Sequence, residues 1–312
     1  MQNNLNQHTA DIVLRSSDGT LFYSWKTLLS ISSPVFSDMF TLTQPATLND
    51  TDDGRPVIDL TEDSCTLGRI LSLCHPASCT GKQFKVESVP ELGAVLEVTT
   101  KYDMENIRSV VLEELTRPSF LRQDPVRIYA LACQYGYPEA ARLAAKHALA
   151  LPTLVRGYVP ELEKIHAGTL CRLLLYREAC MTAALDVAQD HAWILYPHSS
   201  PLFGCDGGES DNDVGWTTVR YHPSRKYRSG RVERVSVHTW WLDYMKKSGQ
   251  ALQRSPHGGA VKDKELVNDV LSTISSSDCK ECDTSEVLET FRSFVEIFAE
   301  EIDSRVTRVC HL

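Results

Sequence analysis

The stretch "DIVLRSSDGTLFYSWKTLLSISSPVFSDMF" (residues 11–40) changes its hydrophobic pattern midway. Its first half alternates with a period of two around a Ser-Asp-Gly turn, which predicts a β-hairpin over residues 11–26 that reverses at Gly19. Its second half has helical spacing, with Ser33 placed to cap a helix and Pro34 suited to that helix's first position. The apolar residues of this helix are Val35, Phe36, Met39 and Phe40.

The pattern continues as a mixture of strand and helix up to about residue 116. "VIDL" (57–60) predicts a strand and Cys65–Cys74 a helix, while apolar stripes recur at helical spacing over residues 90–115. Two strands, a helical pair, a strand and more helices make an α+β unit.

The residues of this unit resemble the BTB/POZ domain. The resemblance lies in Asp11-Ile12, in Lys26 followed by Leu29, Ser32-Ser33, Phe36 and Met39-Phe40, and in "ELGAVLEVTTKYDMENI" (91–107). It covers roughly residues 10–116. Two positions depart from the family: Trp25 stands where His is usual, and Cys74-His75-Pro76 replaces an aromatic-Tyr ending.

The resemblance implies a small sheet capped by helices and a recognition module that acts through its surfaces, not through catalytic side chains. Its implied partners are proteins: another BTB domain, in a homo- or heterodimer, or a cullin-type ubiquitin-ligase scaffold. Cullin-recruiting members carry a hydrophobic-x-acidic step after the helix that ends here at Phe40. Leu42-Thr43-Gln44 lacks the acidic residue, which argues against the cullin partner.

A mostly helical region is predicted to follow over residues 117–195. Residues 117–125 contain two prolines and predict a linker, and the next helices join at Gly136-Tyr137-Pro138. A further helical pair is predicted within 158–195, entered after Gly168. The region resembles the helical extension of many BTB proteins, and "DPVRIYALACQYGYPEAARLAAKHAL" (124–149) is similar to BTB proteins expanded in basidiomycete fungi.

Residues 196–312 predict a mixed C-terminal region. The acidic, Gly-rich residues 204–213 predict a mobile loop, and a β-hairpin is expected around residues 216–237. A helix is expected from Thr239. One long final helix closes the chain, with Asp283 and Glu286 as its capping box.

Composition sets limits on function. The chain has 312 residues, a formal net charge of −9 and 42% hydrophobic residues, which predict a packed core and argue against general affinity for nucleic acid or anionic membrane. It has no apolar run long enough for a membrane span and no secretory signal pattern at its start. Its ten cysteines are therefore expected to be reduced, in a cytoplasmic or nuclear protein.

The sharpest local motif is Cys279-Lys280-Glu281-Cys282, whose spacing suits zinc. Further ligands would have to come from Cys205, His198, His222 and His238, none of which pairs with another at ligand spacing. The acids Glu281 and Asp283 would raise the pKa of the thiols. The sequence therefore assigns no metal site, although a structural zinc stays an alternative.

A basic segment between Arg220 and Arg234 is the second motif. It holds six Lys and Arg residues against Glu233, and the neighbouring aromatic residues could stack on nucleic-acid bases. These are Tyr221, Tyr227, Trp240 and Trp241. The alternative, favoured by the overall charge, is a solvated loop that balances the acidic residues 206–213.

Enzyme motifs are absent from the sequence, and His147, His166 and His191 fall in helical stretches without a catalytic partner. No catalytic, cofactor-binding or metal-binding residue is assigned. The first hypothesis is a non-enzymatic adaptor or scaffold that acts through its BTB/POZ-like domain. The alternative is a metal-dependent or nucleic-acid-binding regulator that uses residues 205–282.

Overall fold

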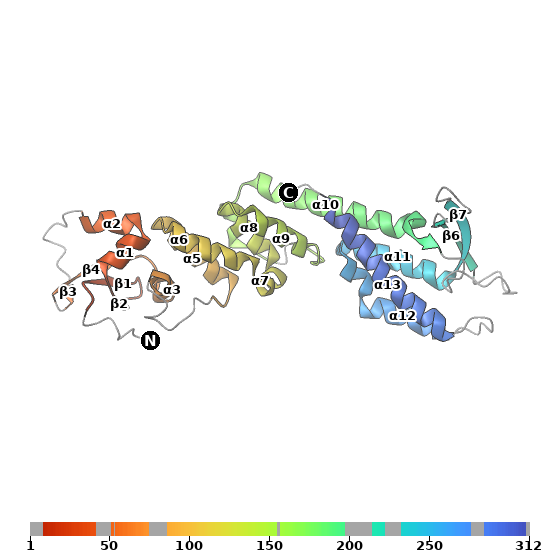
Figure 1. The fold of residues 1–312 in the computed structure, drawn as a ribbon, viewed down its shortest axis with the longest axis horizontal. Helices are drawn as coiled ribbons and strands as arrows, with labels where there is room; N and C mark the ends of the chain where they lie inside the picture. The colour runs from red at the N-terminus through yellow and green to blue at the C-terminus, as the bar shows by residue number, and fades with distance from the viewer. Residues whose placement is uncertain are drawn as a thin grey trace. The chain divides into compact units, whose positions relative to one another are not determined.

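A computed structural model describes residues 9–41, 51–52, 54–74, 86–154, 157–196, 214–221, 232–275 and 284–309. The chain divides into two compact units, Met1–Ala144 and Ala145–Leu312. Figure 1 shows the elements of each unit.

A four-stranded mixed sheet lies in the first unit. Its strands are β1 (Ile12–Arg15), β2 (Leu21–Ser24), β3 (Thr51–Asp52) and β4 (Arg55–Asp59), in the order β2-β1-β4-β3. β1 pairs with β2 in antiparallel and with β4 in parallel register. The hairpin between β1 and β2 turns at Gly19, whose φ of 82° favours glycine. The predicted hairpin is confirmed.

The rest of the first unit is helical, and its last helix extends past the unit's boundary at Ala144. The helices are α1 (Lys26–Ser32), α2 (Pro34–Thr41), α3 (Ser64–Cys74), α5 (Val89–Lys101), α6 (Glu105–Glu113), α7 (Pro118–Gln123), α8 (Pro125–Gln134) and α9 (Pro138–Ala148). The core is built from the buried central strand β1 and from helix residues such as Leu29 and Leu92. The expected break between α8 and α9 occurs at Gly136, which has a φ of 68°.

The expectation of a linker over residues 117–125 is wrong. Residues 118–123 form α7, and Phe120 and Leu121 on that helix are buried. Pro118 occupies the first turn, where a missing N–H costs nothing. The Arg117 guanidinium lies 4.4 Å from the centre of the Phe120 ring. The prolines therefore begin helices here and do not mark an open connection.

The second unit is mostly helical. Its helices are α10 (Ala167–Gln189), α11 (Thr239–Arg254), α12 (Lys264–Ser275) and α13 (Thr284–Thr307), with short 3-10 turns at Pro160–Lys164, His191–Trp193 and Gly258–Lys262. A small sheet joins β5 (Leu195–Tyr196), β6 (Val214–Tyr221) and β7 (Val232–His238). The expected hairpin is the antiparallel β6–β7 pair. The long final helix is also confirmed, although Asp283 of its expected capping box lies outside the part that the structure describes.

The expectation of a helical pair within 158–195 is wrong, because the structure has one long helix there, flanked by short 3-10 turns. α10 runs unbroken for 23 residues, because no Pro or Gly interrupts it after its first turn. α10 packs against α11 and α13 (Figure 1).

Aromatic rings fill the core of the second unit. The Tyr244 ring contacts Phe291 edge-on at 5.0 Å between centroids, and Phe294 stacks on Phe298 at 5.8 Å. The Tyr244 hydroxyl donates to the Val261 carbonyl at 2.9 Å, which satisfies its one polar group. The fold prediction, a small N-terminal sheet with helices followed by a mostly helical region, is thus confirmed.

Candidate interaction surface

The turn between α1 and α2 is held rigidly by a buried serine. Ser33 Oγ donates to the Tyr102 carbonyl and accepts the Phe36 N–H at 3.1 Å, so it caps α2 as expected. The Phe36 ring stacks on Tyr102 with centroids 4.6 Å apart. The turn between α1 and α2 is therefore fixed against Tyr102, at the C-terminal end of α5.

The start of α1 is tied to β1 in the same way. The Asp11 carboxylate accepts the Lys26 N–H at 2.7 Å, and Trp25 Nε1 donates to the Thr9 carbonyl at 2.9 Å. Trp25, which departs from the usual family residue, thus has a defined structural role. Because hydrogen bonds hold both ends of α1, the helix has a fixed orientation, and so does its outer face.

That outer face carries one large, strongly exposed apolar side chain. Ile31 is 74% exposed, whereas Leu29 and Phe36 on the inner side are buried. Leu28, one turn before Ile31, is only half-buried. Val35 and Met39, one turn apart on α2, are also half-buried. The rigid α1–α2 face, defined here by Leu28, Ile31, Val35 and Met39, is our candidate interaction surface.

A partly buried ionic cluster joins the C-terminal end of α5 to Glu62. Lys101 Nζ and the Tyr102 hydroxyl donate to the Glu62 carboxylate at 2.6 and 2.9 Å. Burial acts to raise the pKa of Glu62, but the hydrogen bonds from Lys101 and Tyr102 outweigh it and lower that pKa. Burial raises the pKa of Tyr102 to about 12. Glu62 is therefore a paired structural carboxylate, unsuited to proton transfer near neutral pH.

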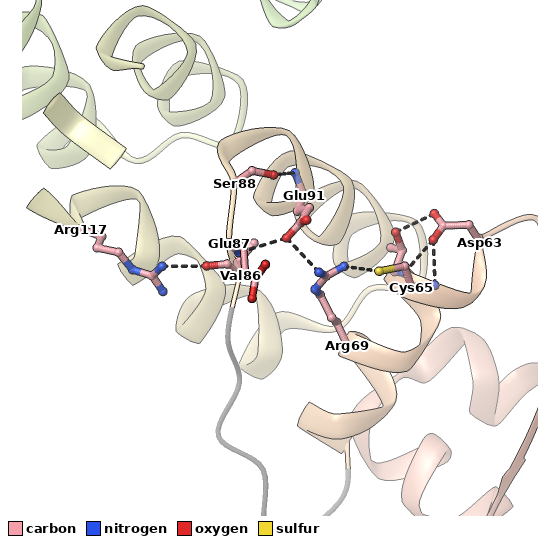
Figure 2. A network of polar contacts seen from close by, with 9 residues as sticks. Asp63, Cys65, Arg69, Val86, Glu87, Ser88, Glu91 and Arg117 are labelled. Carbon is pink, nitrogen blue, oxygen red and sulfur yellow. Dashed lines mark hydrogen bonds and ion pairs between the residues drawn. The ribbon is translucent and has the colours of Figure 1, made fainter. Parts of the chain in front are cut away.

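A second polar network joins α3 to the start of α5 (Figure 2). The Asp63 carboxylate accepts the N–H groups of Cys65 and Thr66, both at 2.9 Å, and so caps α3. One turn later, Arg69 donates to Cys65 Sγ and to the Glu91 carboxylate, again both at 2.9 Å.

Figure 2 also shows how this network reaches the first turn of α5. Glu91 accepts the Glu87 N–H at 3.0 Å, and Ser88 caps α5 by accepting the Glu91 N–H at 3.4 Å. Nearby, Arg117 donates to the Val86 carbonyl at 2.8 Å. These groups satisfy one another, so the network positions helices and leaves no activated base or nucleophile.

The metal alternative falls mainly on residues that the structure does not describe. Cys205, Cys279, Cys282, His198 and His222 all lie outside the described ranges. His238 is described, and its ring stacks on Trp240 at 5.5 Å. Within the described ranges, no group of three or more His, Cys, Asp or Glu residues could hold a metal ion.

The structure weakens the nucleic-acid alternative, because the two tryptophans that were expected to stack on bases pack against other aromatic rings of the protein. Trp241 is buried in the core of the second unit, 5.6 Å from Phe294, and half-buried Trp240 contacts Phe291 edge-on. The expectation that both rings offer free stacking surfaces is therefore wrong. Residues 222–231, which hold most of the basic side chains, are not described.

The helical histidines form no catalytic set among the described residues. His191 Nε2 lies 2.9 Å from the Ala188 carbonyl, and burial lowers the pKa of the His191 ring. His166 is exposed at the start of α10, and His147 lies in the last turn of α9.

The comparisons with known proteins agree with the geometry of the first unit. The family model described as BTB/POZ domain matches residues 1–119. No curated protein matches the chain. Residues 1–119 are thus a BTB/POZ domain, generally a protein–protein interaction module, and no catalytic family is identified. None of the helices described is long and apolar enough to cross a membrane.

Proposed function

We propose that this protein is a non-enzymatic adaptor or scaffold whose BTB/POZ domain engages another BTB domain through the α1–α2 face. The observation that carries the proposal is Ile31, a large apolar side chain that is 74% exposed on a helix anchored at both ends. Burying such a side chain on association removes apolar area from water, which favours binding. The rest of the chain would select a client protein.

The test is the substitution Ile31→Asp in the full chain. Because Ile31 is exposed, the variant keeps its fold but places a charge in the interface, and we expect self-association measured by light scattering to weaken at least about tenfold. Val110→Asp is the matched control, since Val110 is 48% exposed and lies on α6, outside the four residues that define the proposed face. Equal association of both variants and the parent would refute the α1–α2 contact.

Cullin binding is expected to be weak, because Leu42-Thr43-Gln44 lacks an acidic residue at its third position. These residues lie outside the described ranges, so the expectation rests on the sequence. Gln44→Glu should strengthen binding to a purified cullin in calorimetry. Tight binding by the unmodified chain would contradict it.

We propose a relation to BTB proteins expanded in basidiomycete fungi, supported by the sequence of residues 124–149 and of the helical stretch that follows. We infer that this helical region is the client-selecting part.

A further inference from the structure

A groove of about 390 Å³ lies between α10 and α11 in the second unit, where the two helices run side by side (Figure 1). Its apolar lining includes Leu185, Ala188, Leu242, Met245 and Gly249. Its polar lining is Gln189, Lys246, Gln250 and Gln253, with His191 at one end of α10.

The apolar surface continues along α10 beyond the groove. Leu174, Met181 and Leu185 recur at i, i+7 and i+11, which places them within about 40° of one another around the helix. Leu174 is 51% exposed. The face extends roughly 16 Å along the helix axis, which suits a macromolecule better than a small ligand.

Two opposite charges lie at opposite ends of this face. Gly249 is closest to Leu185 and Ala188, while the Arg254 carbonyl accepts a hydrogen bond from Arg177, so α10 and α11 are antiparallel. Glu178 therefore lies near the end of α11, and Lys246 near the end of α10. Both side chains are exposed, and neither forms an ion pair with any residue that the structure describes.

We propose that a second copy of this chain docks on the α10–α11 face by a two-fold axis that crosses it near Leu185 and Gly249. A two-fold contact uses the same patch on both copies, so an acid and a base on either side of the axis meet twice. Glu178 of each copy then faces Lys246 of the other. Gly249 carries no side chain at the centre, which lets the two faces approach closely. This contact is independent of the proposed α1–α2 contact.

The size of the face sets the strength of the contact. α11 has 16 residues and is about 24 Å long. Two adjoining helices about 20 Å wide together would bury roughly 500 Å² per copy, at the low end for specific interfaces. Association should therefore be weak, reversible and sensitive to salt.

The test is a charge exchange in the full chain, with Ile31→Asp present throughout to remove the proposed BTB contact. Glu178→Lys and Lys246→Glu each place like charges together at both ends of the face. We expect each variant alone to lose self-association at least about tenfold in sedimentation equilibrium at low salt. An equimolar mixture of the two should associate again, because opposite charges then meet at both ends.

Matched controls are Glu289→Lys and Lys264→Glu, which make the same charge changes at exposed positions on α13 and α12. They should associate as the parent does. The proposal is overturned if the parent stays monomeric, if either groove variant associates as the parent does, or if the mixture fails to recover. Failure to recover would point to a different protein as the occupant.

Discussion

At the scale of single residues, Arg177 joins three segments of the second unit. Its guanidinium donates to the carbonyls of Ala148 and Leu151, at 3.1 and 2.8 Å, and to that of Arg254. These carbonyls lie at or just beyond the C-terminal ends of α9 and α11, where a cation is favoured by the helix dipole. Burial lowers the pKa of Arg177, yet an arginine stays charged at any physiological pH.

We expect Arg177→Met to lower the free energy of unfolding by about 2–3 kcal/mol, because it leaves several partly buried carbonyls without a charged donor. Arg177→Lys should recover part of the loss, since it keeps the charge but not the planar fork. Urea unfolding measures both. Arg172→Met, an exposed arginine on the same helix, is the control and should change stability by less than about 0.5 kcal/mol.

Two histidines make stability depend on pH. Burial lowers the pKa of His191 and of His257, although Asp190 and Asp303 act in the opposite direction. His257 Nδ1 accepts the Gly259 N–H at 3.0 Å, which a protonated ring cannot do. Their contribution to stability is thus complete above the unfolded pKa of about 6.5 and declines as pH falls toward the folded pKa.

We therefore expect the urea midpoint of the full chain to fall between neutral pH and about pH 5.5. The double variant His191→Gln, His257→Gln should show a flatter profile over this range. Carboxylates with a lowered pKa, such as Glu62, lose their contribution to stability as pH falls below the ordinary glutamate pKa of about 4.5, which is outside this window. An equally steep profile in the double variant would show that other groups titrate there.

At the scale of elements, the 3-10 turn at Gly258–Lys262 packs against α13 with no room for a side chain. A Cβ at Gly258 would collide with the Ala299 carbonyl oxygen and would lie 2.7 Å from Asp303 Oδ2. The Gly258 N–H donates to Asp303 at 2.7 Å. Backbone atoms cannot yield as a flexible side chain can.

Gly258→Ala should therefore destabilise the chain by about 1–3 kcal/mol, since it forces the turn away from α13. Thermal unfolding measures the change. Gly168→Ala is the matched control, because no atom lies within 4 Å of its added Cβ. A neutral Gly258→Ala would mean that the turn shifts without cost.

Hydrophobic periodicity predicted most of the helices and strands, but it missed some helices and the full extent of others. The hairpin, α2, α11 and α13 followed from spacing and caps. A helical pair was expected within 158–195, where α10 runs as one helix, and α7 was taken for a linker because of its prolines. α12 was not predicted, although Leu266, Val270 and Ile274 recur at four-residue steps and Asp263 accepts the Glu265 N–H. Local pattern could have found α12; burial of Phe120 on α7 depends on the tertiary fold.

At the scale of the whole molecule, the resemblance predicted that the first unit acts through its surfaces, but not where such a surface lies or which residues compose it. Ile31 and Phe36 are both apolar and lie in adjoining helices, yet one is 74% and the other 2% exposed. The hydrogen bonds of Ser33 and Asp11, together with the burial of Leu29, orient α1 so that Ile31 faces outward. The α10–α11 face was not predicted, because its two helices are separated by about 50 residues of sequence.

The extent of the first unit gives the last prediction. The chain's first compact unit reaches Ala144, beyond the residues that the BTB/POZ model matches. α8 packs on α5, where a Cβ at Gly93 would lie 3.3 Å from Leu131 Cδ2, and Ile128 and Leu131 are buried. A fragment that ends at residue 120 cuts through α7 and uncovers this part of α5.

Fragment 1–149 should therefore be more stable than fragment 1–120 by about 2 kcal/mol or more, the contribution of one or two buried aliphatic side chains. Trp25 is the sole tryptophan of both fragments, so its fluorescence reports the same site in each during urea unfolding. Leu131→Ala in fragment 1–149 should move its midpoint toward that of 1–120, whereas Leu143→Ala, at a position that is 42% exposed, should not. Equal midpoints for the two fragments would show that the BTB/POZ domain is complete without α8 and α9, and that the contact of α8 with α5 adds nothing to its stability.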